Sequence, residues 1–234
     1  MISSNSCSAV LAGAILASTL LAPTAVQARD GEAYVQYALG LTDPLDTEFR
    51  VDGIKQANRV DYHTGQFDTA LSVGYDFGTI RAEGEFIAQR SRIHDYIVNV
   101  PTLLTGPEVA QPALYPDVKG YTHRKALMAN IIVETGGNGK IGLYGGLGIG
   151  FQNVKASRFR SRLLLDPFID ASSTRLVGQA IVGAYIPLSK NLDLGVKYRL
   201  IHGEGFKYTS IQGGQTFKGN FGSHSWLGTL AWNF

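Results

Sequence analysis

Cysteine is nearly absent from this chain of 234 residues. The only one, Cys7, lies ahead of the first apolar run. Disulfide scaffolds and zinc sites with thiolate ligands need cysteines at regular spacing. The sequence therefore excludes both, and it also lacks a phosphate-binding loop. We expect no metal ion and no cofactor.

Long hydrophobic runs are scarce as well. The uncharged run from Ala9 to Ala22 is too short for a spanning helix, which needs about 20 apolar residues. Val26 and Ala28 then place small residues at the two positions that signal peptidase recognises. We predict a signal peptide at residues 1–28, although no Lys or Arg precedes its apolar run, and a single mature domain at 29–234. Cys7 would be removed with the signal.

A strong excess of charge is also missing. The chain has 21 basic and 19 acidic residues, which gives a net charge of +2 and argues against a nucleic-acid partner. Apolar residues make up 44% of the chain, a share that soluble proteins have too, so bulk hydropathy does not decide the class. The 28 glycines and the 10% of aromatic residues fit a β-protein.

What the sequence does have is alternation with a period of two. From Phe67 to Phe77 the odd-numbered residues are apolar or Thr, and the even-numbered ones are small or acidic. Segments of about ten residues with this pattern are typical of transmembrane β-strands. A soluble barrel would alternate too, with its large residues inward. The C-terminus favours the membrane, because the chain ends on Phe and apolar side chains share one face of its last segment: Trp226, Leu230, Trp232 and Phe234.

The same pattern predicts eight strands, at about 32–41, 67–77, 80–90, 121–134, 140–154, 174–186, 191–202 and 223–234. Their connections alternate in length. Three are short turns, at Gly78–Thr79, Thr135–Gly139 and Pro187–Lys190, and four are long and polar, at 42–66, 91–120, 155–173 and 203–222. We expect every proline of the mature chain to lie in a connection. The predicted fold is all-β: an eight-stranded antiparallel up-and-down transmembrane β-barrel with short periplasmic turns and long extracellular loops.

Four blocks of the chain resemble the opacity-type outer-membrane β-barrel family. They are LSVGYDFGTIRAEGEF (71–86), KALMANIIVETGGNGKIGLYGGLGIGF (125–151), QAIVGAYIPLSKNLDLGVKYRL (179–200) and the terminal SWLGTLAWNF. The resemblance implies a small porin-like surface protein or surface antigen in the outer membrane of a Gram-negative bacterium. It implies no activity, because family members share a scaffold rather than a chemistry. The expected partners are outer-membrane lipid, lipopolysaccharide and, through the C-terminal strand, the barrel-assembly machinery; a partner for the loops cannot be named.

Every second residue of a barrel strand points inward, and this alternation predicts a network of charged residues in the lumen. Three of its members lie on the third strand and three on the seventh: Arg81, Glu83, Glu85, Asp193, Lys197 and Arg199. These strands are opposite each other in a ring of eight, whose interior is about wide enough to be filled by side chains. We interpret the network as a plug, with a gate or narrow channel for small solutes as the alternative. Glycines between 142 and 150 are expected to make room for bulky inward side chains.

An enzyme that modifies lipid A is a further alternative. Barrels of the deacylase type carry His-x-Ser, a pattern that none of the five histidines shows: His63, His94, His123, His202 and His224. The palmitoyltransferase type opens with an amphipathic helix, whereas the first strand here begins soon after Arg29. Asp61 with His63, and His94 with Asp95, remain as fragments of a site. The loop arginines 158, 160 and 162 could pair with lipid phosphates or be solvated. We favour a non-enzymatic barrel.

We predict cleavage after Ala28, since Val26 and Ala28 are the well-placed small pair behind the apolar run. N-terminal sequencing of the outer-membrane form should begin at Arg29. A mature protein that retains Met1 would contradict the secretion argument.

Overall fold

The computed structural model describes residues 31–51, 53–99, 113–115, 119–135, 141–161, 164–209 and 216–234. The described residues form strands and their connections, and no helix among them is long and apolar enough to cross a membrane. The strands are β1 Glu32–Pro44, β2 Thr47–Val51, β3 Ile54–Tyr62, β4 Gln66–Asp76, β5 Ile80–Val98, β6 Ala113–Tyr115, β7 Lys119–Thr135, β8 Gly142–Ser161, β9 Leu164–Pro187, β10 Leu192–Thr209 and β11 Thr216–Asn233. The predicted signal peptide, and residues 136–139 of one predicted turn, lie outside the described residues.

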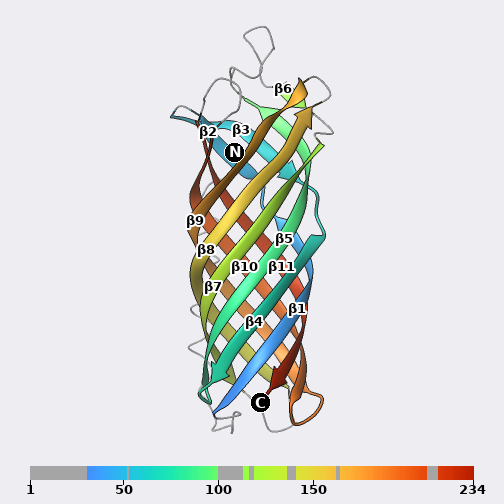
Figure 1. Ribbon diagram of the computed structural model, residues 1–234, viewed down its shortest axis with the longest axis vertical. Helices are drawn as coiled ribbons and strands as arrows, with labels where there is room; N and C mark the ends of the chain where they lie inside the picture. The colour runs from blue at the N-terminus through green and yellow to red at the C-terminus, as the bar shows by residue number, and fades with distance from the viewer. Residues whose placement is uncertain are drawn as a thin grey trace.

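Eight of these strands close into a ring, which Figure 1 shows from the side. Its order is β1–β4–β5–β7–β8–β9–β10–β11, and β11 pairs back onto β1. Every neighbouring pair is antiparallel. Each predicted strand coincides with one member of the ring, so the predicted eight-stranded up-and-down barrel is confirmed.

The lower part of the barrel, next to the short turns, carries apolar side chains on its outer surface. Each ring strand contributes to this apolar band, with exposed fractions of 42–65% at Leu39, Leu71, Phe86, Ile131, Leu147, Val182, Val196 and Leu230. The inner face at the same level is polar: Asp68, Ser72 and Asp76 are at most 2% exposed. This is the predicted orientation, with large residues toward lipid and small or charged residues toward the lumen.

Several ring strands are much longer than predicted. β8, β9, β10 and β11 have 20, 24, 18 and 18 residues, whereas a transmembrane strand needs about 9–11. Parts of the predicted loops at 91–120, 155–173 and 203–222 are therefore strand, and this part of the prediction was wrong. The expectation that every proline lies in a connection was also wrong, because Pro167 lies within β9, and Pro44 and Pro187 are the last residues of β1 and β9.

The predicted loop at 42–66 also contains strands. Where β1 and β4 end, the hairpin of β2 and β3 continues the wall, because β2 pairs with β11 and β3 pairs with β5. Gly53, at the tip of this hairpin, has a φ of +90°, a conformation that favours glycine. The wall thus continues past the ends of β1 and β4, with β2 and β3 near its top (Figure 1).

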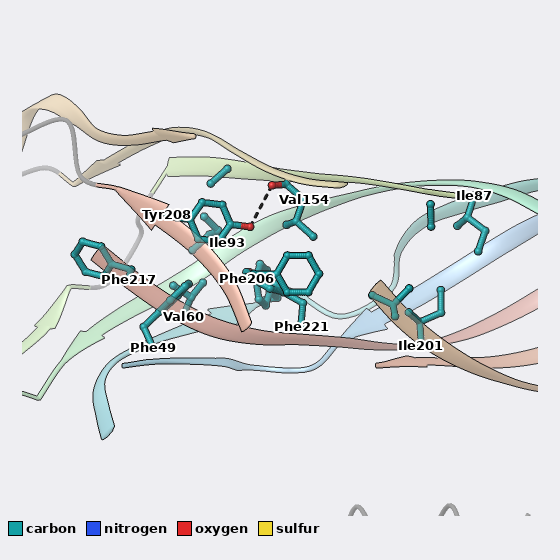
Figure 2. Close-up of a cluster of buried hydrophobic side chains, with 14 of the residues drawn as sticks. Phe49, Val60, Ile87, Ile93, Val154, Ile201, Phe206, Tyr208, Phe217 and Phe221 are labelled. Carbon is teal, nitrogen blue, oxygen red and sulfur yellow. Dashed lines mark hydrogen bonds between the residues drawn. The ribbon is translucent and has the colours of Figure 1, made fainter. Parts of the chain in front are cut away.

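In this upper part the two faces exchange character. Outward side chains such as Arg90, Lys125 and Lys155 are exposed and charged. The interior instead holds an aromatic core that includes Phe49, Phe206, Tyr208, Phe217 and Phe221 (Figure 2). Burial of apolar surface drives this arrangement wherever water lies outside. The apolar band therefore ends at Ala88 on β5, Leu127 on β7 and Phe151 on β8.

The sidedness of the barrel can be tested because the predicted mature chain contains no cysteine. We expect Glu48→Cys and Lys218→Cys, both exposed in the upper part, to react with a membrane-impermeant maleimide on intact cells. Lys190→Cys, in the short turn between β9 and β10, should react only after permeabilisation. The reverse labelling pattern would show that the barrel is inserted the other way up.

Candidate functional site

The candidate site is the charged interior of the lower barrel. β5 and β10 stand four places apart in the ring of eight, and alternation turns every second side chain of each strand inward. All six predicted residues are buried there, with exposed fractions from 0% to 8%: Arg81, Glu83, Glu85, Asp193, Lys197 and Arg199.

Glu85 is the centre of this group. Its Oε1 accepts hydrogen bonds from Lys197 Nζ at 3.1 Å and from Arg199 Nη1 at 2.8 Å. Its Oε2 accepts from Asn130 Nδ2 at 3.1 Å and from Gln179 Nε2 at 2.9 Å. One carboxylate on β5 therefore binds side chains of β7, β9 and β10 across the lumen.

Arg199 extends the group to β4. Its Nη2 donates to both carboxylate oxygens of Asp68 at 2.7 Å, and Gln89 donates to the same carboxylate at 2.8 Å. Glu83 lies at the edge, 3.9 Å from Lys197 Nζ, and accepts from Tyr34 Oη at 3.0 Å. We define the lumenal ion cluster as Asp68, Glu83, Glu85, Lys197 and Arg199.

Two of the predicted residues belong to other contacts. Arg81 pairs with Asp76 at 3.0 Å and with Glu134 at 2.5 Å, nearer the short turns. Its guanidinium also lies 5.3 Å from the ring centroids of Tyr34 and Tyr185. Asp193 accepts from Asn233 Nδ2 at 2.8 Å. The interior thus contains a second group of charged residues. Alternation along the strands could not separate the two groups, because it places both on the inner face.

Several members of the site were absent from the sequence prediction, among them Asp68, Asp76, Asn130, Glu134 and Gln179. Asp68 belongs to the even-numbered face of residues 67–77, so its inward direction was available from the alternation. Its partnership with Arg199 was not, because this depends on the relative height of strands that are not neighbours. Asn130 and Gln179 are uncharged and carry no distinctive pattern.

Inward glycines between 142 and 150 provide space for large side chains, as expected, because a Cβ atom at Gly142 would overlap the Tyr185 ring and one at Gly148 the Asn130 side chain. Inward glycines on other strands do the same. A Cβ atom at Gly183 would overlap the Tyr144 ring, and one at Gly74 would overlap the Tyr34 ring. Both tyrosines are nearly buried, at 8% and 3% exposed. The lower lumen is therefore filled by aromatic as well as ionic side chains.

The histidines that the sequence analysis considered as fragments of an enzyme site lie away from the lumenal ion cluster. His94 Nδ1 is 2.9 Å from Asp95, and its ring packs edge-on against His63 at 4.7 Å between centroids. Asp61 pairs with Arg59 instead, at 2.6 Å. His224 hydrogen bonds with Tyr198. Among the described residues, no three or more His, Cys, Asp or Glu side chains are arranged to hold a metal ion.

We predict energetic coupling between Glu85 and Lys197. Breaking a buried ion pair typically costs about 3–5 kcal/mol, so Glu85→Gln should lower the free energy of unfolding in urea by roughly that amount. Lys197→Met should cost less, because Arg199 still binds Glu85. The double variant should lose less than the sum of the two single losses.

The matched control combines Glu85→Gln with Lys207→Met, an exposed lysine on the same strand as Lys197, for which the losses should add. Additive losses for Glu85 and Lys197 themselves would show that the strands do not communicate across the lumen.

Comparison with known proteins agrees with this architecture. A family model described as the outer membrane protein β-barrel domain matches residues 12–221. No curated protein sequence matches the chain. Among solved structures, the chain is similar to neisserial surface protein A (NspA), with 14% identity and a TM-score of 0.51 over 86% of this chain and 97% of that one. It is also similar to OprG from Pseudomonas aeruginosa, with 14% identity and a TM-score of 0.50 over 91% and 99% of the two chains.

At such low identity the two structures support the fold alone, whereas the family model covers most of the chain. The chain therefore belongs to the outer membrane protein β-barrel family, as its resemblance to opacity-type barrels predicted, and its location is the outer membrane of a Gram-negative bacterium.

Proposed function

We propose that this protein is a non-conducting, non-enzymatic surface barrel that presents its tall extracellular half for interaction, in the manner of a surface antigen. The observation that supports the proposal is a double closure of the interior. The lumenal ion cluster fills the membrane-spanning half, and the aromatic core fills the extracellular half.

The lower closure consists of paired charges rather than an open ring of like charges. Glu85, Lys197 and Arg199 are each at most 1% exposed, and each binds a group on another strand. An ion that passed this level would have to break several of these contacts. Buried charges that lose a partner carry a large desolvation cost, so the cluster favours a plug over a gate.

The upper closure is apolar. Phe221 packs edge-on against Phe206, with 5.1 Å between ring centroids, and against Phe49 at 6.1 Å. The Tyr208 hydroxyl donates to the carbonyl oxygen of Val154 at 3.1 Å (Figure 2). The aromatic rings come from the neighbouring strands β2, β10 and β11. Buried side chains on β3, β5 and β8 belong to the same cluster, among them Val60, Ile93 and Val154, so the cluster spans the cross-section.

Arg124 lies at the junction of the two closures. Its side chain is buried, with its guanidinium 5.2 Å from the Tyr62 ring centroid and 5.6 Å from that of Phe221. Its Nη1 donates to the carbonyl oxygen of Gly222 at 3.2 Å. A cation above the lumenal ion cluster opposes the passage of other cations. Arg124 therefore counts against the alternative of a narrow channel for small solutes where those solutes are cationic.

The exposed part of the extracellular half offers a polar surface. On the β2–β3 hairpin, Arg59 pairs with Asp46 at 2.5 Å and with Asp61 at 2.6 Å. Such exposed pairs contribute little to stability, and they leave the surface free for a partner that the chain does not identify.

Two closures in series predict a specific conductance pattern in planar bilayers. The native barrel should pass no resolvable current. Phe206→Ala with Phe221→Ala, which opens the upper closure, should also be silent, and so should Glu85→Ala with Lys197→Ala, which opens the lower one. The four substitutions together should produce discrete channels.

Folding of each variant is checked by heat-modifiable migration in gel electrophoresis, because each Phe→Ala change in a packed core costs about 3–5 kcal/mol. A control with Leu230→Ala on the lipid-facing surface should stay silent. Regular channels from the native barrel would overturn the proposal and favour a narrow porin-like role.

A further inference from the structure

A group of cationic side chains lies on the outer surface of β5, β7 and β8, directly above the apolar band. We name it the cationic belt: Arg90, Arg92, His123, Lys125 and Lys155. Arg90 is opposite His123, and His123 is in turn opposite Lys155. Directly opposite residues on neighbouring strands have Cβ atoms about 5 Å apart, so the three side chains form one row across three strands.

The belt is partly preorganised by an aromatic side chain. Tyr121 lies between the two arginines, with its ring centroid 4.1 Å from Arg90 Cζ and 5.8 Å from Arg92 Cζ. Stacking on an aromatic face restricts a guanidinium while leaving its N–H groups available to an anion. A phosphate group that binds there would pay less to order these side chains.

Within the part of the chain that the structure describes, Arg90, Arg92, Lys125 and Lys155 form no ion pair. Arg59, which lies opposite Ile97 and farther from the apolar band, contacts two carboxylates. The pKa of His123 is lowered by its partial burial and by the positive charges of Arg90, Lys155 and Lys125, which agrees with a locally positive surface.

The opposite side of the barrel carries a row of cations too, but farther from the apolar band. There Lys207, Lys218 and Arg50 lie opposite one another on β10, β11 and β2, and His202, nearer the band, is 3.6 Å from Glu204. Among the described residues of these two rows, only the cationic belt lies directly above exposed apolar side chains. This position indicates a site for an anionic molecule that approaches β5, β7 and β8 from the side.

The position of the belt specifies what kind of anion fits. Lys125 is two residues from Leu127, and Lys155 is four residues from Phe151 on the same outward face, where both apolar side chains are more than 60% exposed. A ligand here would meet cations with one end and the apolar band with the other. Free phosphate satisfies only the first half of this surface, whereas a phosphorylated glycolipid satisfies both.

We propose that the cationic belt binds the phosphate groups of lipid A in the outer leaflet, with the acyl chains lying against Leu127 and Phe151 below it. This site is separate from the interior, so it does not depend on whether the lumen is closed. It also differs from the loop arginines 158, 160 and 162, whose side chains lie outside those that the structure describes.

Native mass spectrometry of the barrel in detergent tests the site with bis-phosphorylated lipid A as the probe. The native barrel should retain this lipid A in preference to the same lipid after enzymatic removal of both phosphates. The variant Arg90→Gln, Lys125→Gln, Lys155→Gln should retain at least about tenfold less, because each basic residue near an anionic lipid surface contributes measurably to binding. All three side chains are exposed, so the barrel should fold, as heat-modifiable migration would verify.

The matched control is Lys207→Gln with Lys218→Gln, which removes exposed lysines from the opposite face and should change retention less than about twofold. Addition of inorganic phosphate should not displace the lipid. Equal retention by the native barrel and the belt variant, or equal retention of the dephosphorylated lipid, would overturn the proposal. Displacement by millimolar inorganic phosphate would overturn it too, in favour of a site for the free anion.

Discussion

Closure of the sheet is the constraint on which this structure depends. In lipid no water is available to pair with exposed backbone N–H and C=O groups, so every strand edge must be paired within the protein. The pairing of β1 with β11 removes the last two edges. With eight strands the enclosed space is narrow, and inward side chains must fit one another as closely as in a protein core. The mutual contacts of Glu85, Lys197 and Arg199 follow from that confinement.

The environment outside the wall then determines the composition inside it. Next to lipid, apolar residues gain nothing by turning inward, and the polar residues excluded from the lipid face must pair with each other in the lumen. Above the apolar band the outer face meets water, and Phe206, Phe217 and Phe221 occupy the interior instead. One continuous wall thus encloses two interiors of opposite character, an ionic one and an aromatic one.

The sequence predicted the eight ring strands and the direction of their side chains, because a period of two is strong wherever one face is uniformly apolar. It did not predict the upper strands. There the outward residues are polar and mixed, as at Arg90 to His94, and the segment is typical of a solvated loop. Nor did it predict that Asp68 binds Arg199, since alternation specifies the face of a residue but not its height relative to distant strands. The relative height of two distant strands is set by the register of all the strand pairs between them, and closure of the ring fixes that register.

The reversal of polarity along the wall also sets how deeply the barrel is immersed. Displacement toward the cell would draw Lys125 and Lys155 into hydrocarbon, where a basic side chain costs up to about 2–4 kcal/mol near the midplane. Displacement the other way would lift Leu127 and Phe151 into water. Several strands carry this same transition, so the costs act together around the circumference. The barrel therefore has one preferred depth and little freedom to slide along its axis, which holds the extracellular hairpins at a constant height above the lipid.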